Sequence, residues 1–117
     1  MYSILFWFYS PEIYFHLAAS FERSEEKYEF WDENFKNNTN LSHHLLTLIK
    51  DLESTKKIIF ASSYLIYEPK LYQFKEPQDY PKSLKESDPI YPRNLTGVAK
   101  LSHEIDLRFI NHFKNKK

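Results

Sequence analysis

Apolar residues along this chain recur with two different spacings, and the change of spacing predicts the order of strands and helices. Residues 2–9 (YSILFWFY) and 12–19 (EIYFHLAA) are rich in aromatic and β-branched side chains without a helical period, which is typical of strands. Residues 58–60 (IIF) form a third apolar run, which is continuous rather than alternating. A continuous run favours a strand covered on both faces, as in a parallel sheet.

Helical spacing begins after the second of these runs. From about residue 28 to residue 52 the apolar side chains recur every three or four positions, which predicts a helix. The polar stretch KNNTN at 36–40 weakens that helix locally, because Asn and Thr are poor helix formers. A last helix is predicted over about residues 95–114. The apolar positions that define the two helices are Phe30, Trp31, Phe35, Leu41, Leu45, Ile49 and Leu52, and then Val98, Leu101, Ile105, Phe109 and Ile110.

A long segment without a regular period separates the third strand from the last helix. Residues 68–93 hold every proline except Pro11, which predicts a loop. Long loops inside compact domains tend to carry function. The resulting order of strand, strand, helix, strand, loop and helix predicts the α/β class. We expect a short parallel sheet flanked by helices, in one domain over residues 1–117.

Three short segments are expected to meet at one edge of this sheet. HLAA at 16–19 and FASS at 60–63 end two predicted strands, and TGVAK at 96–100 opens the last helix. In an open α/β sheet, ligands bind outside the carboxyl ends of the strands. We therefore expect the three segments to line a common cleft, which is the candidate functional site.

Composition narrows the classes of function. The chain has 16 basic and 16 acidic side chains, so no net field attracts nucleic acid or an anionic membrane surface. It has no cysteine, and its histidines lack carboxylate or thiolate companions at ligand spacing, so no metal site is expected. No apolar run approaches the roughly 20 residues of a membrane span. The aromatic share of 18% supplies material for a core and argues against disorder.

In order and spacing, these segments resemble the extended short-chain dehydrogenase/reductases that modify nucleotide sugars, the NAD-dependent epimerase/dehydratase family. The resemblance covers roughly residues 11–113. It implies a partial Rossmann-like fold, NAD as the cofactor and a nucleotide sugar as the substrate. The motifs that carry it stand here as HLAAS (16–20), FWDENF (30–35), FASSYLIY (60–67), LKESDPIYPRN (84–94) and TGVAKLSHE (96–104).

The resemblance assigns roles to particular residues. Ser63 matches the catalytic serine or threonine, Lys100 matches the catalytic lysine that also contacts the cofactor, and Thr96 occupies the position of the catalytic tyrosine. In the family that tyrosine takes a proton from a sugar hydroxyl, helped by the nearby lysine, while NAD accepts the hydride. The cofactor-facing positions are Ala18 and Ala19, beside the bound dinucleotide, and the helix asparagine Asn34.

Two departures from the family pattern lower the expected activity. The Thr96 hydroxyl is far too weak an acid to become the base, and neither Tyr64 nor Tyr91 holds the position four residues before Lys100. Gly97 is the only glycine, so the glycine-rich turn that cradles the pyrophosphate in the family is not found in this sequence. We therefore expect an internal fragment of such an enzyme, without the N-terminal glycine-rich unit and with little or no turnover.

Other interpretations fit parts of the pattern. Taken singly, Ser63 is an ordinary polar residue after a strand, and Lys100 is a solvated helix lysine. A non-catalytic α/β module that binds a full-length relative or another protein is the main alternative. A small secreted domain is a third, if MYSILFWFYS and HLAAS belong to a signal sequence. The family resemblance instead implies the bacterial cytoplasm, sugars for surface polysaccharide, and a homodimer formed through the helices at 28–52 and 95–114.

Overall fold

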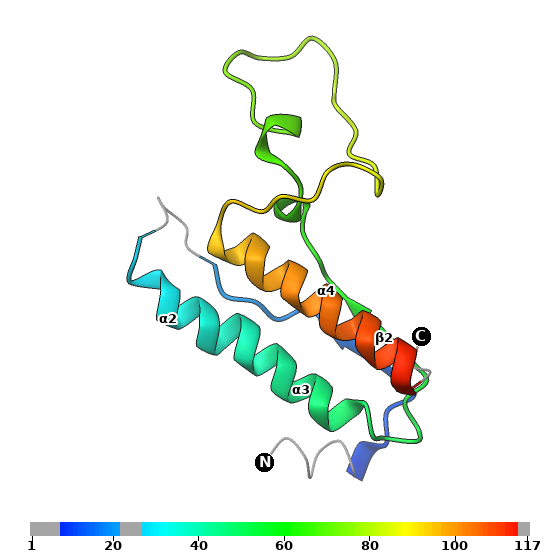
Figure 1. The fold of residues 1–117 in the computed structure, drawn as a ribbon. Helices are drawn as coiled ribbons and strands as arrows, with labels where there is room; N and C mark the ends of the chain where they lie inside the picture. Colours follow the sequence, from blue (N-terminus) through cyan, green and yellow to red (C-terminus); the bar gives the residue numbers. More distant parts are fainter. Residues whose placement is uncertain (1–7, 22–26, 115–117) are drawn as a thin grey trace.

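Two strands and two long helical rods make up the body of the molecule, with a loop that extends away from it (Figure 1). The computed structural model describes residues 8–21 and 27–114. The elements are β1 (Ile13–His16), α2 (Phe30–Asn34), the π-helical segment η1 (Phe35–Asn40), α3 (Leu41–Ile49), β2 (Lys57–Phe60), the 3₁₀ turns η2 (Tyr64–Ile66) and η3 (Pro69–Leu71), and α4 (Leu95–Lys114).

The two strands pair in parallel, as predicted. Their register runs from Ile13 opposite Lys57 to His16 opposite Phe60. The pairing continues past the strand ends, because the Ala61 amide donates to the His16 carbonyl oxygen at 3.1 Å. Parallel strands require a crossover connection, and α2, η1 and α3 supply it here. The predicted α/β class with a parallel sheet is confirmed.

Both helical rods cover the same face of this sheet. His16 contacts Ser42 of α3 by a hydrogen bond and His103 of α4 by ring packing. On the opposite face, Ile13 is 50% exposed and Phe15 is 57% exposed. Cover on both faces, which the continuous run at 58–60 favoured, is therefore not found within the described residues.

The predicted helix over residues 28–52 forms one rod that changes geometry in its middle. The π-helical segment η1 coincides with the polar stretch that was expected to weaken the helix. Asn34 and Asn38 are buried here, whereas Trp31 and Phe35 are 55% and 56% exposed. The apolar spacing had placed Trp31 and Phe35 on the inward face. This is wrong, because the two asparagines take the inward positions. There they hydrogen-bond to each other, and Asn38 also bonds to the backbone of Ser20.

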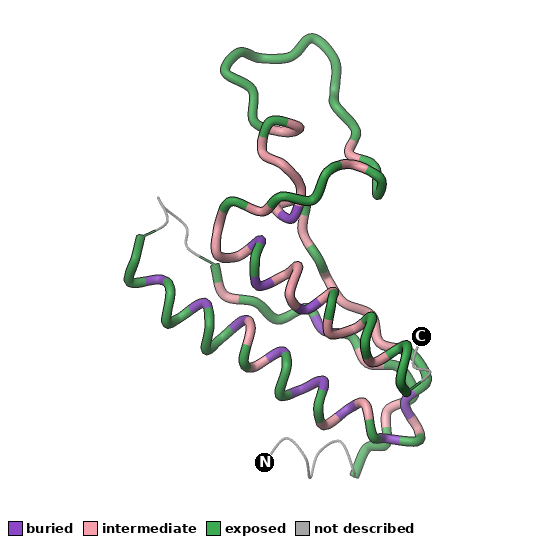
Figure 2. The backbone as a smooth tube through the Cα atoms, viewed as in Figure 1, coloured by how far each residue is buried: buried purple, intermediate pink, exposed green. Residues whose placement is uncertain are grey.

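The core lies between the helical rods and the sheet (Figure 2). Thr55 closes one end of it, where its hydroxyl donates to the Pro11 carbonyl oxygen at 2.6 Å. The strand predicted over residues 2–9 falls mostly outside the described residues. Its described part is wrong, because Phe8 and Tyr9 are helical and exposed. The buried apolar side chains of the core are Phe30, Leu45, Leu46, Ile49, Leu52, Ile66 and Ala99.

The predicted long loop is confirmed and projects from the body between η3 and α4 (Figure 1). Its base is closed by backbone hydrogen bonds from the Glu68 amide to the Pro89 carbonyl (3.0 Å) and from the Tyr91 amide to the Ile66 carbonyl (3.0 Å). None of the described helices is both long enough and apolar enough to cross a lipid bilayer.

Candidate functional site

The carboxyl ends of both strands and the start of α4 meet at one place, as the sequence predicted. A small hollow of about 10 Å³ marks the junction. It joins segments that are far apart in the sequence: the chain after β1, the helical rod, the end of β2 and the first three turns of α4. Its lining residues are Ala18, Ala19, Asn38, Ser42, Phe60, Thr96, Ala99, Lys100 and His103.

Lys100 is built into this junction rather than lying free in solvent. Its ammonium donates to the Ala61 carbonyl oxygen at 2.7 Å and lies 4.6 Å from the centre of the Phe60 ring. Partial burial lowers the pKa of the ammonium from its ordinary value. The interpretation of Lys100 as a solvated helix lysine is therefore excluded.

The start of α4 is held against the chain that follows β2. The Asn94 side chain caps the helix by accepting from the Gly97 amide at 2.6 Å. A Cβ atom on Gly97 would lie 2.5 Å from the Leu65 carbonyl oxygen, which is closer than any real contact. The only glycine is thus needed for a close approach of two backbones, and this approach places Thr96 at the hollow.

Ser63 lies at the same end of the sheet but does not line the hollow. Its hydroxyl accepts from the Leu65 amide at 3.2 Å and so caps the 3₁₀ turn η2. The neighbouring Ser62 donates to the Glu104 carboxylate of α4. Lys100 thus contacts Ala61, two residues before Ser63 in the chain, while the Ser63 side chain caps the turn.

Asn34 is separated from the hollow by Asn38, which the sequence interpretation missed. The Asn38 side chain accepts from the Ser20 amide at 2.6 Å and donates to the Ser20 carbonyl at 2.5 Å. It also donates to the Asn34 side chain at 2.8 Å. Asn38 thereby fixes the segment that carries Ala18 and Ala19. The signal that could have found it is the polar stretch at 36–40, because a buried helix that keeps asparagines needs a partner for them.

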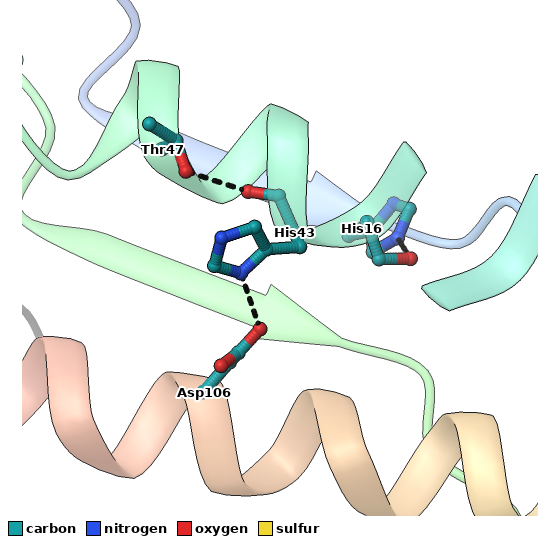
Figure 3. Close-up of polar contacts among 5 residues, drawn as sticks. His16, His43, Thr47 and Asp106 are labelled. Atoms are coloured by element: carbon teal, nitrogen blue, oxygen red, sulfur yellow. Dashed lines mark hydrogen bonds and ion pairs between the residues drawn. The ribbon is translucent and has the colours of Figure 1, made fainter. Parts of the chain in front are cut away.

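Two buried histidines pack against each other at this junction, where His103 lines the hollow, and neither is assigned a role from the sequence. His16 Nε2 lies 2.7 Å from the Ser42 hydroxyl (Figure 3). The His103 ring packs edge-on against the rings of Phe60 and His16, with centroids 4.2 Å and 4.9 Å apart. Burial lowers the pKa of both imidazoles, to about 4 for His103, so both are neutral at pH 7.

A third histidine ties the helical rods together on their outer side. His43 Nδ1 lies 2.9 Å from the Asp106 carboxylate, which joins α3 to α4 (Figure 3). This pair is largely exposed and lies apart from the hollow. It is a surface contact between helices.

Among the described residues that line the hollow, none has a side chain suited to acid–base catalysis near pH 7. Lys100 is a cation, Thr96 is a weak acid, and His103 binds a proton only near pH 4. The two tyrosines weighed as replacements do not line it: Tyr64 packs on Tyr72, and Tyr91 lies under the Arg93 guanidinium. What the site retains is a cationic donor and hydroxyls around a small recess that alanine and phenylalanine side chains also line.

No protein-family model and no curated protein matches this chain. Solved structures do. The chain is similar to the UDP-glucuronic acid 4-epimerase from Bacillus cereus in complex with NAD, with 21% identity, a TM-score of 0.71, and coverage of 97% of this chain and 31% of that one. It is also similar to an NAD-bound short-chain dehydrogenase/reductase superfamily protein from Agrobacterium tumefaciens, with 24% identity, a TM-score of 0.67, and coverage of 88% and 28%.

A third similar structure is the UDP-N-acetylglucosamine 4-epimerase from Methanobrevibacter ruminantium, with 26% identity, a TM-score of 0.63, and coverage of 89% and 30%. The fold of this chain matches one part of each of these structures. The resemblance drawn from the sequence motifs is confirmed at the level of the fold. This chain spans less than a third of the length of each of the three.

Proposed function

We propose that this chain is an internal segment of an NAD-dependent nucleotide-sugar epimerase or dehydratase, and that alone it has little or no turnover. The observation that carries the proposal is that Ala18, Ala19, Thr96 and Lys100 meet at the carboxyl ends of the strands. These four positions are far apart in the sequence, and their meeting supports the roles that the resemblance implies for them.

The residues present fit one part of the cofactor and not another. Ala18 and Ala19 are exposed, so a dinucleotide can lie along their backbone, and Lys100 offers its remaining ammonium protons to a ribose. NAD, when bound, would accept a hydride from a sugar carbon. Binding the pyrophosphate calls for a glycine-rich turn, and the sequence has one glycine, which is used in the packing of α4.

Ser63 and Thr96 would face the substrate side of the site. A serine hydroxyl at position 63 can orient a sugar oxygen once the substrate displaces its bond to the Leu65 amide. Thr96 stands where a base is needed and cannot supply one, because its hydroxyl stays protonated at any physiological pH. The chain therefore keeps the arrangement of the site residues but lacks the base that the reaction requires.

Placing a tyrosine at position 96 tests whether the base is the only feature that is missing. We expect Thr96→Tyr to give no detectable epimerisation of UDP-glucose or UDP-N-acetylglucosamine with NAD, because the glycine-rich turn that binds the pyrophosphate is not restored. Thr96→Ser serves as the matched control for folding. Turnover gained by Thr96→Tyr alone would overturn the proposal.

Cofactor affinity gives an independent test. Calorimetric titration of the purified chain with NAD is expected to show binding no tighter than the millimolar range. Any heat should be reduced in Lys100→Gln, which removes the cation but keeps a donor. A micromolar dissociation constant would contradict the assignment.

The proposed cellular compartment follows from the same family resemblance. Enzymes of this family that make surface-polysaccharide sugars act in the bacterial cytoplasm, and we propose the same compartment here. A second candidate function, a non-catalytic interaction module, is favoured by one observation: the apolar stripe of α4 is largely exposed. Its members are Val98, Ile105, Phe109 and Phe113.

A further inference from the structure

One buried side chain at the hollow is not used by the chemistry proposed above. His103 is 3% exposed and lines the hollow. Among residues 8–21 and 27–114, neither of its ring nitrogens has a hydrogen-bonding partner. A buried polar group without a partner costs about 1–3 kcal/mol. Buried polar groups in native proteins are therefore nearly always bound by protein or by ordered water.

His103 lines the hollow, so a molecule held there can reach its ring. Two sides of the ring are taken by Phe60 and His16. The polar groups that act on His103 already have partners: His16 with the Ser42 hydroxyl, the Lys100 ammonium with the Ala61 carbonyl, and Asp106 with His43. Each of these groups keeps further capacity, because a hydroxyl and an ammonium form more than one hydrogen bond.

The volume of the hollow and the residues that line it determine which molecule it can hold. A hollow of about 10 Å³ is close to the smallest that holds one water molecule, and it is too small for a sugar or a nucleotide. A buried water needs roughly two to four polar partners. The lining offers the imidazole of His103, the hydroxyls of Ser42 and Thr96, and the ammonium of Lys100.

We propose that this hollow binds one ordered water molecule, with His103 as its main partner and the Lys100 ammonium as the second. The water accepts from the ammonium and donates to the unprotonated nitrogen of the imidazole. His103 is then a positioning residue, which acts on Lys100 through the water. The inference rests on the geometry of the hollow and holds whether or not the chain binds NAD.

The test is NMR of the full chain, with the Ala99 methyl group as the reporter because it lines the hollow in every variant. We expect a long-lived contact from water to this methyl group in the wild type. The contact should be lost in His103→Phe and kept in His103→Gln, which retains a donor and an acceptor. His44→Phe, a change at an exposed histidine that does not act on His103, should leave it intact.

A second readout separates positioning from simple packing. We expect the pKa of Lys100, followed by its side-chain resonances, to fall further in His103→Phe and to return towards the wild-type value in His103→Gln. Absence of the water contact in the wild type would overturn the inference. The inference would also be overturned if a folded His103→Phe kept both the water contact to the Ala99 methyl group and the wild-type pKa of Lys100. If His103→Phe does not fold, the wild type and His103→Gln decide, since both must show the contact.

Discussion

At Gly97 the backbone of α4 passes so close to the Leu65 carbonyl oxygen that no side chain fits between them. The glycine has ordinary helical geometry, so its role is close approach rather than an unusual backbone angle. The sequence could show that the one glycine opens a helix. It could not show the reason, because the second backbone comes from residues about thirty positions earlier.

Gly97→Ala tests this contact. Alanine is the better helix former by about 1 kcal/mol, so a helix without the contact would gain stability. We expect instead a loss of about 1–3 kcal/mol, as for other overpacked sites. Urea unfolding measures it, with Val98→Ala at the neighbouring exposed position as the control. A stabilised Gly97→Ala would show that the approach is not as close as described.

The two buried histidines predict how stability depends on pH. Their folded-state pKa values lie below the ordinary 6.5, to about 4 for His103, so the unfolded chain binds protons first as the pH falls. Above about pH 6.5 the two histidines do not change the free energy of unfolding. Between pH 6.5 and pH 4 they lower it progressively. For His103 the decrease reaches on the order of 2–3 kcal/mol. After burial, His16 lowers the pKa of His103 most, Lys100 and His43 lower it further, and Asp106 is the acidic group that opposes the shift.

Urea unfolding of the wild type and His103→Phe at pH 7, 5.5 and 4.5 checks this prediction. The stability of the wild type should fall more steeply than that of the variant. Identical slopes would mean that His103 is not buried in its neutral form.

At the scale of elements, the π-helical segment η1 sets the position of the chain after β1. Its extra backbone residue turns Asn38 inward, where the side chain binds both the amide and the carbonyl of Ser20. π-helical turns often occur at functional sites. Here the turn carries a residue that lines the hollow.

We expect Asn38→Ala to lower the free energy of unfolding by about 2 kcal/mol, because it removes the partner of the partly buried Ser20 amide and of the buried Asn34 side chain. The Ser20 amide should also exchange with solvent much faster. Asn37→Ala, at the adjacent exposed position, is the control. Equal stability of the two variants would remove Asn38 from its proposed role.

Strand pairing, the long loop and α4 followed from the sequence, because each depends on local pattern and on topology. Parallel pairing followed from the helix between the strands, and the meeting point from the rule for strand ends. The inward position of Asn38 did not follow from the sequence, because a π segment shifts the inward face of the rod away from the regular helical period. The family resemblance assigns Asn34, which lies one turn away from Asn38 in the lining of the hollow.

At the scale of the whole molecule, two apolar surfaces stay uncovered within the described residues. One is the sheet face with Ile13 and Phe15, and the other is the α4 stripe, where Phe109 and Phe113 stack on each other with centroids 6.1 Å apart. The sequence could mark these residues as apolar. It could not say that they face outward, because spacing alone does not tell a core stripe from an interface.

We expect the chain to self-associate through α4. Sedimentation should show a dimer at micromolar concentration, and Phe109→Glu should shift it to monomer because a charge cannot be buried unpaired in such a contact. Arg108→Gln, on the adjacent exposed residue, should leave the dimer intact. A monomeric wild type would argue against this surface as an interface.

The central claim is that two strand ends and one helix start form a single site around Lys100. NMR distance contacts on the unliganded chain test it most directly. The account predicts contacts from the Lys100 side chain to the Phe60 ring and to Ala61, with Lys100 resonances displaced by the ring. Ordinary solvent-exposed shifts for Lys100, with no contact to Phe60, would contradict it.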